Sequence, residues 1–113
     1  MYKVYFYEQK NGKSPIRKFL DSCQRSLRAK INKQIIALKK FGLTTENPYL
    51  RKLIGTPLWE SSILGKDNTR IICIVRIKRK IVVLNIFRKK GMKTPIKEMN
   101  LSMKRYRDLT SDI

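Results

Sequence analysis

The fold is decided by the stretch TRIICIVRI-KRK-IVVLNIF, which runs from Thr69 to Phe87. Two runs rich in β-branched and aliphatic residues flank the basic corner Lys78-Arg79-Lys80, and each run has the length and composition of a strand. The pattern therefore predicts strands over Thr69–Ile77 and Ile81–Phe87. Because both runs are apolar on both faces, we expect these strands to be central in a sheet and covered on both sides.

The preceding half of the chain predicts one strand and two helices. Residues 2–8 are aromatic and β-branched, which favours a strand, and residues 10–13 form a turn. Ser14-Pro15 is typical of a helix start, with serine as the N-cap and proline at the first helical position. A first helix then carries Ile16, Phe19, Leu20 and Cys23 on one face, and a second carries Leu27, Ile31, Ile35 and Leu38 and ends at Phe41-Gly42.

The remaining segments complete an α+β fold. Thr44–Pro57 is predicted to be a connecting loop, with one helical turn as an option at residues 48–53, and Leu58–Leu64 is predicted to be a strand. A final helix is expected from Thr94-Pro95, with an inward stripe of Ile96, Met99, Met103 and Tyr106. We expect one domain over residues 1–113: an antiparallel-rich sheet, an N-terminal helical hairpin packed on one face, and a C-terminal helix.

The charge of the chain points to a polyanionic partner. There are 27 lysines and arginines against 8 acidic residues, a formal net charge of +19. Such a field opposes folding by self-repulsion, so we expect it to serve binding, with nucleic acid favoured over a membrane surface or a role in solubility alone. The chain lacks a signal-like or membrane-spanning apolar run, so a cytoplasmic location without membrane contact is expected, with Cys23 and Cys73 as free thiols that fill the core.

The absence of histidine narrows the chemistry. The sequence has none, which excludes the Ser-His-Asp, Cys-His and paired-histidine mechanisms. The acidic residues are scattered, and only Glu60 and Asp67 come from neighbouring segments, so neither a metal centre nor another cofactor is expected. RNA is cleaved without either when its 2′-OH attacks the adjacent phosphate. That reaction needs a base, which a lysine provides when its pKa is lowered, and cations such as arginine to neutralise the phosphate.

Three stretches could supply those cations: Arg70, Arg88-Lys89-Lys90 with Lys93 and Thr94, and Arg51-Lys52. Arg70 begins a central strand at the rim of an apolar layer, where a guanidinium is held rigidly, although a solvated arginine at a strand end is the alternative. Arg88-Lys89-Lys90 leaves the last strand, and Lys93 and Thr94 lead into the final helix, whose N-terminus favours phosphate. These residues predict a phosphate site formed where the strand ends and the helix begins.

Arg51, Lys52 and Phe87 are assigned to RNA binding, with a structural alternative for each. Arg51 and Lys52 lie in the connecting loop and either contact RNA or form a solvated surface pair. Phe87 stands beside the basic cluster and either stacks on a base or belongs to the core. Trp59 is interpreted as a core or packing residue rather than a platform for a base.

Several of these motifs together resemble a known family. The segments PYLRKL (48–53), TPLWE (56–60), GKDNTRI (65–71), FRKK (87–90) and KTP (93–95) are similar to the phage-derived branch of the RelE/HigB toxins, and the similarity extends over almost the whole chain. The resemblance implies a RelE-like fold and ribosome-dependent cleavage of mRNA in the decoding site of the small subunit. It also implies a HigA-like helix-turn-helix antitoxin and a toxin–antitoxin heterotetramer.

The resemblance also implies roles for individual residues. Arg70 takes the place of the phosphate-stabilising arginine, one of Arg88, Lys89 and Lys90 that of the basic residue after the last strand, and Arg51 and Lys52 assist RNA binding. Two positions depart from the family pattern. Ser62 stands where many relatives have an arginine. RelE has a catalytic tyrosine near the end of its chain, whereas the nearest tyrosine here, Tyr106, lies within the inward stripe of the final helix. We therefore expect Lys89 or Lys90 to act as the general base.

The strongly basic composition is also compatible with two functions other than cleavage. A non-catalytic protein that binds RNA or the ribosome and blocks translation by occupancy is the main alternative. A DNA-binding protein is disfavoured because no helix has the pattern of a recognition helix.

Overall fold

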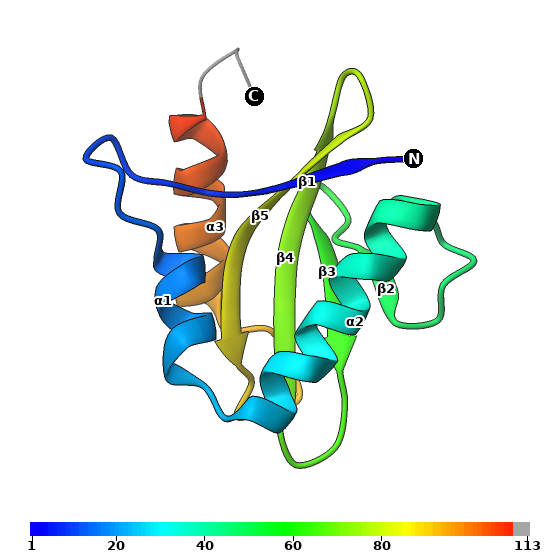
Figure 1. Ribbon diagram of the computed structural model, residues 1–113, viewed down its shortest axis with the longest axis vertical. Helices are drawn as coiled ribbons and strands as arrows, with labels where there is room; N and C mark the ends of the chain where they lie inside the picture. The colour runs from blue at the N-terminus through cyan, green and yellow to red at the C-terminus, as the bar shows by residue number, and fades with distance from the viewer. Residues whose placement is uncertain (110–113) are drawn as a thin grey trace.

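The computed structural model describes residues 1–109 of the 113-residue chain. Its elements in chain order are β1 (Lys3–Phe6), α1 (Pro15–Ser22), α2 (Arg25–Phe41), β2 (Leu50–Lys52), β3 (Trp59–Ile63), β4 (Thr69–Arg76), β5 (Lys80–Arg88) and α3 (Ile96–Asp108) (Figure 1). The five strands form one sheet in the order β1-β5-β4-β3-β2. β1 pairs with β5 in parallel and the other neighbours are antiparallel, so the predicted α+β fold is confirmed.

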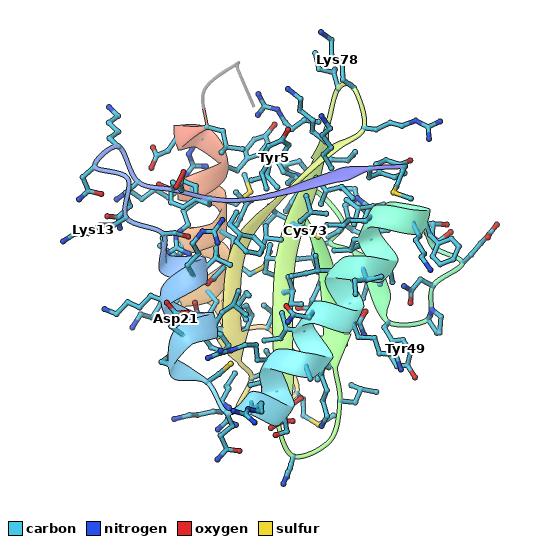
Figure 2. The ribbon with its side chains drawn as sticks, viewed as in Figure 1. Tyr5, Lys13, Asp21, Tyr49, Cys73 and Lys78 are labelled. Carbon is cyan, nitrogen blue, oxygen red and sulfur yellow. The ribbon has the colours of Figure 1, made fainter. Side chains whose placement is uncertain are left out.

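The two strands that decide the fold lie at its centre. β4 and β5 are neighbours, and nearly every residue from Thr69 to Ile74 and from Ile81 to Phe87 is buried, as the continuous apolar pattern predicted. Cys73, in the middle of β4 (Figure 2), is fully buried, and burial raises the pKa of its thiol to about 12. Cys23 is half-buried, and both cysteines are free, as expected.

Helices cover both faces of the sheet. The hydroxyl of Ser61 donates to Gln34 on α2, which lies in front of the sheet in Figure 1. On the opposite face, the amide of Asn85 on β5 donates to Glu98 and Ser102 of α3. Ser61 pairs with Ile71 and Asn85 pairs with Ile72, which are successive residues of β4 and therefore point to opposite faces. α2 and α3 thus contact different sides of the sheet. Among residues 1–109, no helix has the length and apolar character needed to cross a bilayer.

The local signals at the first two helices are confirmed. The side chain of Ser14 accepts a hydrogen bond of 3.2 Å from the backbone N–H of Arg17, and Pro15 opens α1. α2 ends at Gly42, whose φ of 72° is costly for other residues. A Cβ at this glycine would also lie 2.5 Å from the ring of Tyr2, so both the backbone and the neighbouring side chain require glycine here.

Two expectations about local structure were wrong. Residues 48–53 do not form a helical turn: Leu50–Lys52 is an edge strand antiparallel to β3, because Leu50 joins the core and the edge of β3 needs backbone partners. The final helix starts one residue later than predicted, with Pro95 rather than Thr94 as its N-cap. This shift leaves Ile96 77% exposed, whereas Met99, Met103 and Tyr106 do pack against the core.

Candidate functional site

Arg70 is a buried charge on the face of the sheet that α3 covers. It is 7% exposed, and its cross-strand partners are Ser62 on β3 and Phe87 on β5, so the three side chains share one face. Its Nη1 donates to the carbonyl of Thr69 at 3.1 Å, while its buried Nε has no hydrogen-bond partner among the described residues. That Nε lies 3.8 Å from Oε1 of Glu60, close enough for an ion pair.

Glu60 draws four segments of the chain together. Its side chain is 3% exposed and accepts a hydrogen bond of 3.1 Å from Nη2 of Arg51 on β2 and one of 2.6 Å from the hydroxyl of Thr94 before α3. With Arg70 on β4, these residues form what we call the Glu60 cluster: Arg51, Glu60, Arg70 and Thr94. A buried carboxylate is tolerated only with such compensation, so the cluster fixes all four side chains relative to one another.

A second buried carboxylate lies on the α2 face. Asp67, in the turn between β3 and β4, accepts a hydrogen bond of 2.9 Å from Nζ of Lys30, and Nη2 of Arg88 lies 3.5 Å from its other oxygen. We call this set the Asp67 cluster: Lys30, Asp67 and Arg88. The hydrogen bond from Lys30 is the main reason that the pKa of Asp67 is lowered.

The expectation that Arg70 and Arg88 converge is therefore wrong. Arg88 follows Phe87 along β5 and pairs with Thr69 rather than Arg70, so its side chain points to the opposite face of the sheet. It lines a cavity of about 260 Å³ with Phe19, Cys23 and Leu27 of the helical hairpin. Because successive residues of a strand point to opposite faces, Arg88 lies on the other side of the sheet from Phe87 and Arg70.

The lysines after Arg88 lie between the end of β5 and the start of α3. The backbone N–H of Lys89 donates to the carbonyl of Asn68 at 2.7 Å, which extends the ladder one residue beyond β5. Lys89 itself is half-buried. Lys90 and Lys93 are exposed, but the first turn of α3 already contains the carboxylate of Glu98, so the phosphate expected at this helix terminus has a competitor.

An open groove beside the Glu60 cluster brings together four of the five residues predicted to bind RNA. Its volume is about 520 Å³, and it is lined by Arg51, Lys52, Leu53, Ile54, Met92, Lys93, Thr94 and Met99. Arg51 keeps 62% of its side chain exposed, and Nζ of Lys52 donates to the carbonyl of Thr56. Two segments distant in sequence thus form the two walls of a groove with a basic rim.

Phe87 is the fifth residue predicted to bind RNA, and its assignment was wrong. It is 5% exposed and belongs to the hydrophobic core, because it is on the sheet face that α3 and the segment before it cover. A ring that is buried in this way presents no free face on which a base can stack. Trp59, by contrast, packs against the core as expected.

Glu60 is the functional candidate that the sequence analysis missed, since it was considered only as a metal ligand. The signal was an acidic residue inside a strand whose two neighbours both carry arginine. Arg51 on β2 pairs directly with Glu60, and Arg70 on β4 pairs with Ser62, which is two residues from Glu60 on the same face. Within residues 1–109, no group of three or more histidine, cysteine or acidic side chains has the arrangement of a metal site.

Residues 18–107 match the family described as phage-derived protein Gp49-like (DUF891). The chain belongs to this family. The Gp49-like family is linked to RelE-like toxins and is associated with the toxins of toxin–antitoxin systems. The match begins within α1 and ends in the last turn of α3, so it contains both clusters and the groove of this Gp49-like protein. A search of curated proteins returned no match to the chain.

Proposed function

We propose that this protein is the toxin of a type II toxin–antitoxin system, an endoribonuclease of the RelE/HigB type that cleaves mRNA on the ribosome and stops translation. The observation that carries the proposal is the groove, where Arg51, Lys52, Lys93 and Thr94 meet beside a buried arginine in a chain of net charge +19. A rigid sheet with converging cations suits the binding of a ribose-phosphate chain. Membership of the Gp49-like family supports the toxin assignment.

The proposed reaction is transesterification without a metal or other cofactor. The 2′-oxygen bonds to the adjacent phosphorus, the bond from phosphorus to the 5′-oxygen breaks, and the products are a cyclic phosphate and a 5′-hydroxyl. Lys89 or Lys90 takes the proton from the 2′-OH, and the leaving oxygen takes a proton from a cation or water. Arg70 supplies fixed positive charge from behind the groove, while Arg51, Lys52, Lys93 and Thr94 hold the RNA.

The proposed partners follow from the same assignment. A HigA-like helix-turn-helix antitoxin neutralises the toxin, and the two assemble as a heterotetramer. The site of action is the decoding site of the small ribosomal subunit in the cytoplasm. An antitoxin partner is also what the toxin–antitoxin association of the family suggests.

One observation favours the alternative in which the protein blocks translation by occupancy. Glu60 already balances much of the charge of Arg70, and Asp67 pairs with Arg88, so two of the four predicted catalytic cations have carboxylate partners. Catalysis then depends on Lys89 and Lys90, whereas binding depends only on the groove and the overall field.

Induction of the protein in a bacterial host, with mapping of 5′ ends on mRNA, tests both readings. We expect the wild type to create new 5′ ends and Lys89→Ala with Lys90→Ala to remove them while ribosome binding persists. The matched control is Lys10→Ala with Lys13→Ala, which removes two charges at the exposed turn after β1, where Lys13 is labelled in Figure 2, and changes no residue that lines the groove. Arrest without new 5′ ends would support occupancy. Undiminished cleavage in a variant that also carries Arg70→Ala would overturn the proposed site.

A further inference from the structure

We propose that the groove between residues 51–54 and 92–94 is a subsite for one unstacked nucleotide of single-stranded RNA, with the base held between Ile54 and Met92. The inference rests on the proposed function, which assigns RNA binding to this region but gives no role to its apolar residues. The new element is that the groove contacts the face of a base in addition to the phosphate.

The apolar walls of the groove are the first reason. Ile54 is 96% exposed and Met92 is 95% exposed, yet they come from separate loops and line the same groove. Leu53 and the half-buried Met99 form an apolar floor between them. Exposed apolar side chains that gather at one place on a basic surface mark a binding site, and the flexible thioether of methionine adapts to a flat ring.

The charges at the rim are the second reason. Arg51 uses one nitrogen for Glu60, and a guanidinium has five N–H donors, so its exposed edge keeps donors for a phosphate. Lys93 lines the opposite wall. A nucleotide combines an apolar base face with an anionic phosphate, and the groove offers an apolar floor and a basic rim at matching positions.

The Glu60 cluster prepares the groove before anything binds. Arg51 and Thr94 belong to opposite walls, and both donate hydrogen bonds to the same buried carboxylate. The width of the groove is therefore set in the free protein, and less order has to be gained on binding. Its volume of about 520 Å³ is within the range of sites for small ligands, which fits a single nucleotide rather than a protein segment.

Fluorescence anisotropy with a short single-stranded oligoribonucleotide tests the inference, with a base-free analogue of equal phosphate number as the second probe. We expect Ile54→Ala and Met92→Ala each to weaken RNA binding about three- to ten-fold, somewhat less than the loss of an aromatic platform. The double variant should bind both probes equally, because it no longer contacts the base. Both residues are more than nine-tenths exposed, so their truncation leaves the melting temperature unchanged.

Ile77→Ala is the matched control, since Ile77 is an aliphatic residue that is 76% exposed in the turn between β4 and β5. Wild-type affinity for RNA in both groove variants would overturn the inference while leaving the proposed function intact. Loss of neutralisation by the antitoxin with unchanged RNA binding would also overturn it and would make the groove a protein docking surface. Failure of the wild type to bind RNA at all, free or on the ribosome, would remove the proposed function itself.

Discussion

The Glu60 and Asp67 clusters contain the same chemistry on opposite faces of one sheet. Each has a carboxylate whose side chain is 3% exposed, bound by two cations from other elements. The cations of Asp67 are both about half-exposed, whereas one cation of Glu60, Arg70, has a side chain that is only 9% exposed. The Asp67 cluster fastens α2 to the turn between β3 and β4, and the Glu60 cluster shapes the wall of a groove. The location of a charge pair in the fold, rather than its composition, therefore decides its use.

The largest difference should appear when each carboxylate is neutralised. Glu60→Gln leaves the guanidinium of Arg70 buried without a counter-charge, and we expect a loss of about 3–5 kcal/mol in the free energy of unfolding. Asp67→Asn should reduce the free energy of unfolding by less, because the half-exposed side chains of Lys30 and Arg88 can be solvated instead. Urea denaturation of the two variants measures both values, and an equal or larger loss for Asp67→Asn would contradict the expected order.

A compensating variant sharpens that result. If the loss in Glu60→Gln comes from the orphaned guanidinium, adding Arg70→Met should recover a large part of it, since an apolar side chain of similar length needs no counter-charge. The same Arg70→Met change added to Asp67→Asn should give no recovery. Recovery in neither background would mean that hydrogen bonding to Thr94 and Arg51, rather than charge, carries the stability.

The affinity for RNA should depend on the Glu60 cluster much more than on the Asp67 cluster. Arg51→Ala removes a rim cation of the groove, and we expect about ten-fold weaker binding with a salt dependence reduced by about 0.7 in log–log slope, the value for one phosphate contact on a single strand. Arg88→Ala removes the same charge from the other face and should change affinity less than two-fold, on the order of a long-range field effect. Anisotropy titrations at several salt concentrations measure both, and equal losses would show that the field alone attracts the RNA.

Lowering the pH should reduce the contribution of the Asp67 cluster to the free energy of unfolding. Because the pKa of Asp67 is lowered from its ordinary value of 3.8, its contribution to stability is complete above pH 3.8 and is lost as the pH falls through the folded-state value. The difference in unfolding free energy between the wild type and Asp67→Asn should therefore be constant near neutral pH and shrink below pH 3.8. A difference that grows on acidification would contradict the assigned ion pair.

The smallest effect is expected at an exposed partner. Lys30→Ala leaves Asp67 with Arg88 and the solvent, so we expect a smaller loss in the free energy of unfolding than for Asp67→Asn, because half-exposed ion pairs contribute little. The pKa of Asp67 should also move back toward its ordinary value, which the chemical shifts of its carboxyl carbon measure during a pH titration. An unmoved pKa would show that Lys30 is not the main cause of the shift.

The sequence predicted those parts of the fold that periodicity controls. β4, β5 and α2 carry long, regular apolar patterns, and the cap at Ser14 has a local cause. β2 was missed because three residues are too few to show alternation. At the site, Arg51, Lys52, Lys93 and Thr94 were selected individually, but their meeting in one groove depends on pairing across the sheet. Glu60 was passed over because only tertiary structure shows which acid in a strand is buried.

The parallel pairing of β1 with β5 affects how the chain can fold during its synthesis. Lys3 pairs with Lys80, so most of the chain separates two adjacent strands, and joining them requires the closure of a long loop. During synthesis β1 emerges first and has no partner until β5 has left the exit tunnel. A nascent copy therefore cannot complete its sheet early, because β5, the last strand to emerge, lies between β1 and β4.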